Sequence, residues 1–442
     1  QMRSFIPGSI ARSTIPLLCL ALLISCSGER ATAPVSPPVT IGPQQIPITG
    51  AGMPGLEPFE NSVANIMSKY GIPGGAFALV RDGKLIYARG FGYADLENKT
   101  PVQPDARFRI ASVSKMLTSA AIMKLVEEGK LNLEDRVAPI IADLKPAPGS
   151  TVDPRWEQIT IRQLLSHSGG WDRAKPNGGF DPIDRPLIAA AVVGAPAPAS
   201  SETLVRYMKG MPLDFNPGEK FAYSNFGFII LGRVIERLSG MHYEDYVRAR
   251  VLVPVGANRT RQGKSLMKYA LPEEVKYYMA GAPGLNWPMV ASVFPGEGSV
   301  PLNYGGYHLE GGDASGAWVS STVDLLRFVT AVDGRASPPD ILSVGLIAEM
   351  TGSGATVCAN GSCYYAGGWF IRPVQNGATW WHGGDLPGTK AFVVRSYYNI
   401  SWAVLFNAGV SADVGGEIDA ALWAALNNIT SFPTNDLFSS FK

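Results

Sequence analysis

The strongest chemical signal in the sequence is a serine followed three residues later by a lysine. Ser112 and Lys115 stand where a helix is expected to begin, because apolar residues recur at helical spacing after them. Residues three apart share one face of a helix, so the hydroxyl and the amine can come within hydrogen-bond reach. An amine buried in a cleft has a lowered pKa and can take the serine proton. The pair therefore predicts nucleophilic catalysis by Ser112.

The same spacing occurs at two other places, so the pattern alone is a weak signal. Ser265 and Lys268 lie in an irregular, aromatic-rich region, where a solvated lysine is the ordinary expectation. Ser439 and Lys442 stand at the end of the sequence, where we expect fraying. Only Ser112 opens a strongly apolar helix, whose N-terminal N–H groups and partial positive charge favour a nucleophile.

A tyrosine and an asparagine two residues apart form the second candidate element. Tyr223 and Asn225 follow a turn at 216–219 and precede an apolar helix, a junction that can aim both side chains inward. A phenol beside a lysine cation has a depressed pKa, so Tyr223 can act as a general base and acid. Asn225 can bind a substrate amide or hold the lysine and tyrosine side chains. A second Tyr-x-Asn at 397–399 is better explained as a hairpin turn.

The third candidate element is a histidine followed by two glycines. His382, Gly383 and Gly384 directly follow a predicted strand at 378–381. Paired glycines let a substrate backbone approach a strand edge closely, and a backbone N–H beside them can form half of an oxyanion hole. The alternative is an ordinary turn, and the same alternative applies to the His-Ser-Gly-Gly sequence at 167–170.

Hydrophobic periodicity predicts the elements that must position these residues. An apolar hairpin is predicted over 75–91, and helices are predicted to begin near Ser112, Thr160, Ser224 and Ser321. Short β-rich runs follow at 368–371, 378–381, 390–396 and 402–407, before a last helix at 416–426. Strands at both ends with helices between them predict an α+β fold. We expect an antiparallel sheet flanked by helices, with an all-α part inserted within about 112–330.

One long stretch lacks clear periodicity. Residues 171–200 are rich in proline, glycine and alanine. We expect them to form a long surface insertion that can reshape a cleft.

Composition narrows the class of protein. The chain has 442 residues, of which 46% are hydrophobic, enough for a large core. Its 38 basic and 37 acidic residues give a formal net charge of +1, so a nucleic-acid partner, which needs a basic excess, is not expected. The sequence contains 4 His and 4 Cys and neither Cys-x-x-Cys nor His-Glu-x-x-His, so the usual kinds of zinc site are not expected either.

The first residues resemble an export signal. Arg3 and Arg12 precede an apolar run at 15–24, which suits the core of a signal peptide at 1–25. The run ends in Leu-Ile-Ser-Cys and resembles a bacterial lipobox, so Cys26 is the expected lipid-carrying residue. The alternative is an ordinary secretory signal with an incidental cysteine. We therefore expect an exported protein of the bacterial cell envelope that contacts the membrane through a lipid anchor.

A tether and one folded domain are expected after the signal. Residues 26–55 are rich in proline, alanine, serine and threonine, which is typical of a semi-extended linker. The folded domain is expected over 56–430. Within it, Cys358 and Cys363 bracket an Asn-Gly turn, so an exported chain can join them as a disulfide. The alternative is two free thiols.

Taken together, the three elements resemble the serine β-lactamase and penicillin-binding-protein superfamily. The nearest branch contains class C β-lactamases, family VIII carboxylesterases and D-amino-acid-specific peptidases. Three longer segments add to the likeness: Phe-Arg-Ile-Ala-Ser-Val-Ser-Lys at 108–115, Leu-Leu-Ser-His-Ser-Gly-Gly at 164–170, and the stretch at 315–328. The resemblance covers roughly residues 56–428. It implies a mixed α/β domain with an all-α subdomain, an active site between them, and no cofactor.

The resemblance also assigns roles residue by residue. Ser112 matches the acylated nucleophile, and Lys115 matches the amine that activates it. Tyr223 matches the phenol that passes the proton to the leaving group and then helps to activate the deacylating water. Asn225 matches the contact to the substrate amide.

The third motif departs from the β-lactamase pattern. Its members His382, Gly383 and Gly384 match the family motif, but a lysine usually stands where His382 does. The backbone N–H groups of Ser112 and Asp385 are the expected oxyanion hole. A histidine with an ordinary pKa of about 6.5 is mostly neutral at neutral pH, so the charge that would hold a substrate carboxylate is weaker.

The departure favours an esterase or peptidase that acts through an acyl-enzyme on ester or amide bonds. One alternative is a β-lactamase or D,D-carboxypeptidase. Another is a cell-envelope lipoprotein that binds a partner and has lost turnover. If His382 replaces the lysine in function, affinity for anionic substrates should rise as the pH falls through its pKa.

Overall fold

The computed structural model of the protein describes residues 46–176, 178–352, 356–357, 362–375, 377–410 and 414–441. The expected signal peptide, Cys26 and the first part of the expected tether lie outside these residues, as does Cys358. Cys363 is described and buried, and because its expected partner lies outside the described residues, the disulfide stays a prediction.

The centre of the fold is a ten-stranded sheet, and every pairing in it is antiparallel. The strand order is β1-β3-β2-β16-β15-β14-β13-β12-β11, and β4 also pairs with β3. Strands from distant parts of the chain meet where β2 pairs with β16, with Gly75 opposite Phe406. The strands are β1 Ile48–Thr49, β2 Gly74–Arg81, β3 Lys84–Asp95, β4 Thr100–Pro101, β11 Thr356–Val357, β12 Tyr364–Ala366, β13 Trp369–Val374, β14 Gly377–Leu386, β15 Thr389–Arg395 and β16 Ile400–Phe406. The sheet confirms the predicted fold class.

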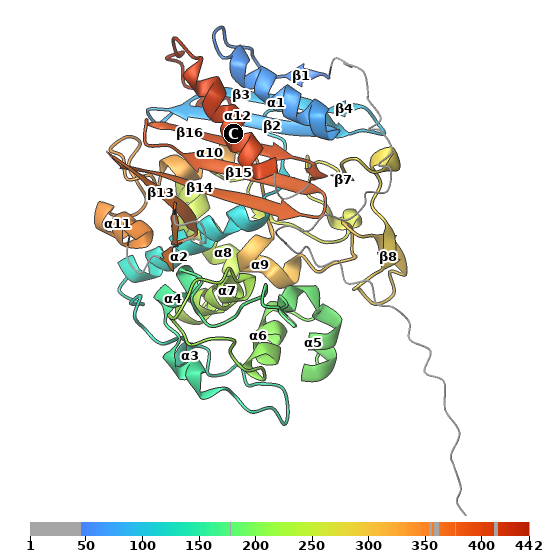
Figure 1. Cartoon of the computed structure of the whole chain (residues 1–442), viewed down its shortest axis with the longest axis vertical. Coiled ribbons are helices and arrows are strands. Elements are labelled where there is room, and N and C mark those ends of the chain that lie inside the picture. The colour runs from blue at the N-terminus through green and yellow to red at the C-terminus, as the bar shows by residue number, and fades with distance from the viewer. Residues whose placement is uncertain are drawn as a thin grey trace, which may run out of the picture. The chain divides into compact units, whose positions relative to one another are not determined.

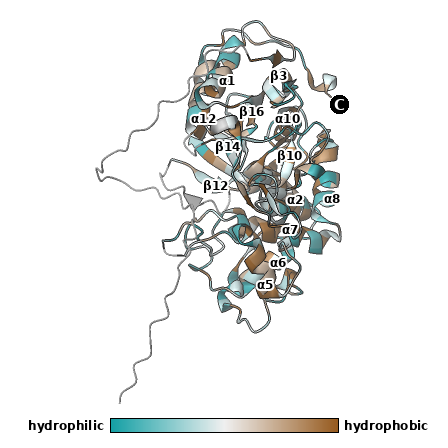
Figure 2. Ribbon diagram, turned by 90° about the vertical axis from the view of Figure 1, so that its right-hand side faces the viewer, coloured by the Kyte–Doolittle hydropathy of each residue, from teal (hydrophilic) through white to brown (hydrophobic). Residues whose placement is uncertain are grey.

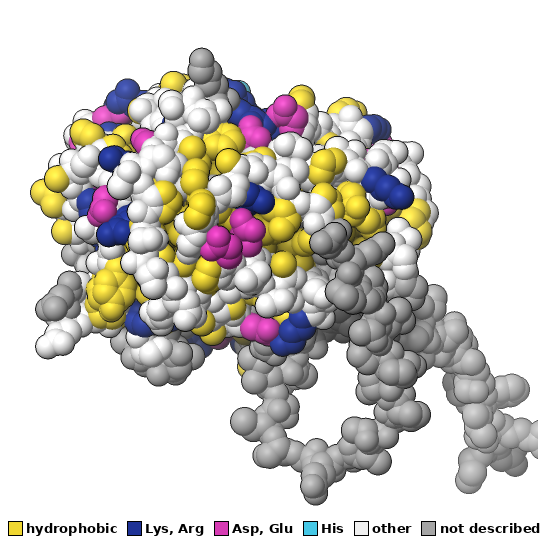
Figure 3. All heavy atoms as spheres, turned by 90° about the horizontal axis from the view of Figure 1, so that it is seen from above, with side chains coloured by type: hydrophobic (Ala, Val, Ile, Leu, Met, Phe, Trp, Pro, Cys, Tyr) yellow, Lys and Arg dark blue, Asp and Glu magenta, His cyan; other side chains and the backbone are white. Residues whose placement is uncertain are grey.

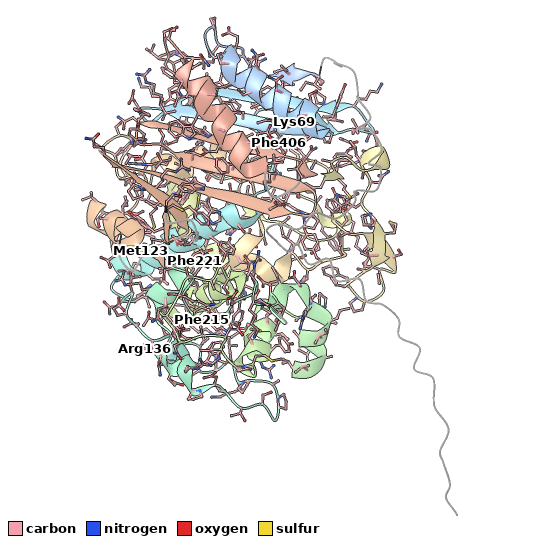
Figure 4. All side chains as sticks on the ribbon, viewed as in Figure 1. Lys69, Met123, Arg136, Phe215, Phe221 and Phe406 are labelled. Atoms are coloured by element: carbon pink, nitrogen blue, oxygen red, sulfur yellow. The ribbon has the colours of Figure 1, made fainter. Side chains whose placement is uncertain are left out.

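Two helices from opposite ends of the chain cover one face of the sheet. They are α1 (Glu57–Tyr70) and α12 (Val414–Asn427), which pack against each other (Figure 1). The apolar side of α1, from Phe59 to Met67, is buried on the sheet. Gly71 ends the helix with φ 64, a left-handed conformation that glycine adopts without a steric cost. Figure 4 marks this layer with Lys69 on α1 and Phe406 on β16.

The opposite face of the sheet packs on the long helices of the middle of the chain. α10 (Thr322–Thr330) contacts β2 and β16, and α2 (Ser114–Glu127) packs against α7 (Asn225–Ser239). Ser224 and Ser321 cap their helices by accepting backbone N–H groups three residues later, as predicted. These caps fix where α7 and α10 begin.

Shorter helices complete the structure. Thr160 and Gln163 form a reciprocal capping box at the start of α4, which confirms the helix predicted there. The shorter helices are α3 Val137–Ile140, α4 Ile161–Leu165, α5 Pro186–Val193, α6 Ser201–Lys209, α8 Tyr243–Val247, α9 Asp313–Gly316 and α11 Val344–Gly352.

Residues 171–200 contain more regular structure than their lack of periodicity suggests. The segment contains a 3-10 turn at Pro182–Asp184 and the helix α5. α5 has apolar residues all round, so it shows no helical period; most of it is brown in Figure 2. Its boundaries were readable, because Pro186 stands at the first helical position and Gly194 follows the last with φ 71.

The all-α part expected within about 112–330 lies at 112–260. Residues 261–320 contain short strands instead: β6 Arg261–Gln262, β7 Tyr278–Met279, β8 Met289–Ala291, β9 Ser299–Pro301 and β10 Trp318–Ser320. β10 pairs with β6 and with β5 (Phe108–Arg109). β5 lies just before the turn that holds Ser112. Runs of two or three residues are too short for a periodic signal.

The folded domain begins earlier than expected. Ile48 and Thr49 pair with Phe91 and Gly90, so β1 extends the sheet within the segment predicted to be a tether. The exposed face in Figure 3 shows basic and acidic side chains interspersed, as the net charge of +1 suggests. No helix among the described residues is both long and apolar enough to cross a membrane.

Candidate active site

Ser112 is held between a strained turn and the sheet. It lies in a 3-10 turn, Ala111–Val113, and α2 begins two residues later, so Ser112 precedes the helix that it was expected to open. Ala111 has φ 48, a left-handed conformation that costs energy for a residue with a Cβ. β14 passes so near that a Cβ on Gly384 would lie 2.3 Å from the carbonyl oxygen of Ile110. The glycine therefore permits the close approach.

The amine of Lys115 is fully buried beside the serine. Its Nζ lies 3.1 Å from Ser112 Oγ, 2.7 Å from Asn225 Oδ1 and 2.8 Å from the carbonyl oxygen of Ser315. Burial lowers the pKa of Lys115 far below its ordinary value, and the positive charge of Arg173 lowers it further. The arrangement favours a neutral amine that can accept the serine proton.

Tyr223 also lies beside the serine hydroxyl. Its phenol hydrogen-bonds Ser112, and the Lys115 Nζ lies 4.9 Å from the centre of its ring. The depressed pKa predicted for this phenol is wrong. Burial raises the pKa of Tyr223, and the hydrogen bond to Ser112 only partly opposes the rise. A protonated Tyr223 can donate a proton, and a neutral Lys115 can accept one.

Asn225 connects the lysine to a buried carboxylate. Its Oδ1 accepts the Lys115 N–H, and its Nδ2 donates to Asp181 Oδ2 at 2.8 Å. The residue is the first of α7, and the Ser224 cap holds the helix start in place. The structure thus supports the expected contact between Asn225 and the lysine.

His382 is buried and makes two short contacts. Its Nδ1 lies 2.6 Å from the carbonyl oxygen of Gly383, which only accepts, so Nδ1 carries the proton. Its Nε2 then accepts from the Tyr365 hydroxyl at 3.1 Å. Burial lowers the pKa of His382 to about 3, and the nearby Lys115 amine acts in the same direction. Burial therefore disfavours a charged His382 in the role of the family lysine.

The edge of β14 is open beyond the middle of the strand. β13 pairs with β14 only as far as Phe370 opposite Trp381, so no strand among the described residues lies against 382–386 on that side. Gly383, Gly384 and Asp385 all border the cavity next to Ser112. The open edge can present a backbone N–H to a substrate oxygen. The oxyanion role expected for Asp385 and Ser112 stays a prediction.

An aromatic wall supports Tyr223 from behind. The ring of His167 lies 4.2 Å from that of Tyr223 and 4.3 Å from that of Tyr365, centre to centre. His167 Nδ1 accepts the N–H of Ser224, which fixes the histidine to the start of α7. Phe221, labelled in Figure 4, packs edge-on against the same histidine. The His-Ser-Gly-Gly segment therefore has a structural part in the site.

A cavity of about 480 Å³ opens over these groups. Its charged side chains are mostly paired: Lys390 Nζ lies 2.7 Å from Asp385, and Arg372 lies 3.6 Å from Asp419. Aromatic and apolar side chains make up much of the remaining wall. They are Ile183, Tyr307, Leu309, Phe370, Trp381, Leu386 and Phe392.

The sequence analysis missed several groups of the site. Asp181, Arg173 and Lys390 reach it from segments without a motif, and Tyr365 reaches it from the short strand β12. The Ser315 carbonyl belongs to a segment noted for its family likeness, but a backbone acceptor leaves no mark in a side-chain pattern. In the part of the chain that the structure describes, no cluster of three or more His, Cys, Asp or Glu side chains is placed to hold a metal ion.

Comparison with known protein families decides the class of the protein. The family model described as Beta-lactamase matches residues 59–427. The chain belongs to the Beta-lactamase family. Members of this family are serine hydrolases, which confirms the resemblance expected from the three motifs.

Individual relatives share the fold at modest identity. Penicillin-binding protein 4* of Bacillus subtilis is 28% identical over 73% of this chain and 65% of its own length. A solved structure of an octameric penicillin-binding protein homologue from Pyrococcus abyssi matches with a TM-score of 0.64 and 27% identity, over 86% of this chain and 80% of that one. D-amino acid amidase from Ochrobactrum anthropi SV3 has the same fold, with a TM-score of 0.61 and 23% identity over 85% and 97% of the two chains.

The chain spans only part of its curated relatives. It covers 65% of the Bacillus protein, and 58% of Protein flp of Staphylococcus aureus strain MW2, to which it is 25% identical over 74% of its own length. The similarity therefore concerns the β-lactamase-fold domain.

Proposed function

We propose that this protein is a serine hydrolase that acts through an acyl-enzyme on Ser112 and cleaves ester or amide bonds. One observation carries the proposal: the fully buried amine of Lys115 lies 3.1 Å from the Ser112 hydroxyl and has a strongly lowered pKa. A neutral amine in that position is a general base for the nucleophile.

The residues suggest a path for the proton. Lys115 takes the Ser112 proton as Oγ attacks the substrate carbonyl, and the developing oxyanion lies between the Ser112 N–H and the open edge of β14. Tyr223 donates its proton to the leaving group, and the proton held by Lys115 restores the phenol. In the second half, a water takes the place of the leaving group and the route runs in reverse. Tyr223 takes the water's proton and passes its own to Lys115, which returns it to Ser112 Oγ as the acid leaves. The enzyme ends with the protons it began with.

The cavity favours substrates without an obligatory negative charge. His382 is neutral, and the cations Lys390 and Arg372 already face carboxylates. A substrate carboxylate would have to displace Asp385 or Asp419 from these pairs. The aromatic wall instead offers apolar contact for an acyl or alcohol group. We therefore favour a neutral ester or amide over a β-lactam or a D-Ala-D-Ala peptide.

Hydrolysis of p-nitrophenyl butyrate and of nitrocefin by wild type and Ser112→Ala tests the proposal. Ester turnover and an acyl adduct in the intact mass, both absent from Ser112→Ala, are the expected results. Ser439→Ala is the matched control, because Ser439 has the same Ser-x-x-Lys spacing but is exposed at the end of the chain. Fast turnover of nitrocefin would support the β-lactamase alternative. No turnover and no adduct with either substrate would support a binding protein.

The export and lipid attachment expected from the sequence belong to the proposal as well. Their support is the apolar run at 15–24 followed by Ser25 and Cys26. Expression in a bacterium with a labelled fatty acid tests them: wild type should carry label and sediment with membranes, and Cys26→Ala should carry none. An unlabelled wild-type protein would refute the anchor.

A further inference from the structure

A buried carboxylate lies behind the catalytic lysine. Asp181 is only 4% exposed and precedes the 3-10 turn at Pro182–Asp184, where it accepts the N–H of Ile183. Its Oδ2 lies 2.8 Å from Asn225 Nδ2 and 3.4 Å from Arg173. Asp181 therefore hydrogen-bonds the asparagine that contacts the lysine, and it has no direct hydrogen bond to the lysine.

The chemistry of the two groups fixes the direction of the amide. An ionised carboxylate only accepts hydrogen bonds, so the NH₂ of Asn225 must face Asp181. The amide oxygen of Asn225 then has to face Lys115, as its 2.7 Å distance to Nζ shows. With a partner that could donate, the amide could turn around and present its NH₂ to the lysine instead.

The direction of this amide decides where the lone pair of Lys115 points. A neutral amine has two N–H groups and one lone pair. The oxygens of Asn225 and of the Ser315 carbonyl both only accept, so each takes one N–H. The third direction from Nζ leads to Ser112 Oγ at 3.1 Å, and the lone pair lies there.

We propose that Asp181 is a positioning residue for the reaction: it holds the Asn225 amide so that the lone pair of Lys115 faces the Ser112 hydroxyl. The inference rests on the proposed function, because it concerns the base of the acylation step. It assigns a role to a residue in the segment that the sequence analysis expected to be a long surface insertion.

The charge of Asp181 also changes the pKa of Lys115, which gives a second way to test this role. Tyr223 faces Lys115 from the loop before α7, His167 from the 167–170 segment and His382 from β14. None of the three is charged in the state that burial favours. The remaining charges are Arg173, which lowers the pKa of Lys115, and Asp181, which raises it.

The carboxyl group of Asp184, close to Asp181, also titrates in the pH range of the test. Burial and the charge of Asp181 raise the pKa of Asp184 to about 6, so its ionisation has to be separated from that of Lys115 in any pH profile.

The first test is the near-isosteric variant Asp181→Asn, studied together with Asn225→Ala. An asparagine at 181 can donate as well as accept, so the Asn225 amide loses its preferred direction. We expect the acylation rate of p-nitrophenyl butyrate to fall on the order of 10- to 100-fold, with little change in KM. In the Asn225→Ala background the same substitution should have no further effect, because no amide is left to orient. Equal losses in both backgrounds would show a merely structural role and overturn the proposal.

The pH profile is the second readout. The acid limb of kcat/KM reports the pKa of the free base. Loss of the Asp181 charge should move this limb to lower pH, and Arg173→Gln should move it to higher pH. The double variant with Asp184→Asn identifies any contribution of Asp184 to the limb. An unmoved limb in Asp181→Asn would contradict the proposal.

Misfolding, loss of catalysis and loss of the Asp181 role give different experimental results. If Asp181→Asn does not fold, Asp181→Ser preserves an acceptor for the Ile183 N–H and takes its place in the double-variant comparison. If wild type forms no acyl adduct, the proposed function fails first. If wild type acylates and Asp181→Asn acylates at the wild-type rate, only the role of Asp181 is overturned.

Discussion

Two Ser-x-x-Lys segments of this chain have the same spacing and opposite chemistry. At the first, the Lys115 amine is fully buried, contacts Ser112 and has a strongly lowered pKa. At the second, Ser265 is buried and donates to Glu310, whereas Lys268 is half-exposed and pairs with Glu297 at 2.5 Å. The ion pair raises the pKa of Lys268, so this amine stays protonated.

The difference shows that spacing alone does not make a base. Lys115 is enclosed by α2, α7 and the α9 carbonyl of Ser315, and water cannot solvate its charge there. Lys268 is solvated and also has a carboxylate partner, and both effects favour the ammonium form. Burial by distant segments therefore distinguishes the reactive pair from the inert one.

Replacing each lysine by methionine tests this contrast most strongly. Lys115→Met should lower kcat/KM for p-nitrophenyl butyrate by more than about 10³-fold, because the serine loses its base. Lys268→Met should leave kcat/KM within about twofold of wild type, because it removes only an exposed ion pair. Steady-state kinetics with a thermal melt for each variant checks both values. Similar losses from the two substitutions would break the contrast.

Tyr223→Phe sharpens the assignment of acid and base. The phenol is protonated in our interpretation, so its loss should matter most where the leaving group needs a proton. We expect a loss of about 10²-fold for an amide substrate and a clearly smaller one for a p-nitrophenyl ester, whose leaving group departs as an anion. Comparing the two substrates on one variant controls for altered folding. Equal losses would instead favour Tyr223 as the base.

Local sequence patterns predicted much of this site, because each motif and each helix cap is formed by residues that are close together in the sequence. The hairpin of β2 and β3, the caps at Ser224 and Ser321, and the three motif segments were all readable, and the structure brings the motif residues together. Long-range placement was not readable. Asp181 shows why: nothing around it in sequence marks a carboxylate that lies against an asparagine 44 residues away.

The protonation states could not be predicted for the same reason. The sequence analysis expected a depressed pKa for Tyr223 and an ordinary one for His382, and both expectations are wrong. Both errors have the same cause. Burial shifts the pKa of each group, and the sequence does not show which distant residues bury it. His382 is covered by Tyr365 from the short strand β12, and Tyr223 by the His167 ring.

Two neighbouring glycines test how tightly the nucleophile turn is held. A Cβ on Gly384 would lie 2.3 Å from the Ile110 carbonyl oxygen, whereas one on Gly383 would meet its nearest atom at 3.8 Å. Gly384→Ala should therefore lower the free energy of unfolding by about 1–3 kcal/mol and lower the acylation rate roughly tenfold, because Ser112 shifts with the turn. Gly383→Ala should lower stability by less. Denaturant unfolding and acylation kinetics measure both, and equal effects would mean that β14 does not fix the serine.

The smallest expected effect concerns His382. Burial lowers its pKa to about 3, so at pH 5 only on the order of 1% of the imidazole is charged. The ratio of KM values for the anionic p-nitrophenyl glutarate half-ester and the neutral p-nitrophenyl butyrate should therefore stay flat between about pH 5 and about pH 8. His382→Gln, which keeps an acceptor for Tyr365, should show the same flat ratio. A ratio that falls several-fold towards acid pH in wild type and not in His382→Gln would mean that the ring does become charged. It would then act as an anion-binding group in spite of its burial. Burial would then favour the neutral form at Lys115 but not at His382, so the contrast between Lys115 and Lys268 could not be extended to the rest of the cavity.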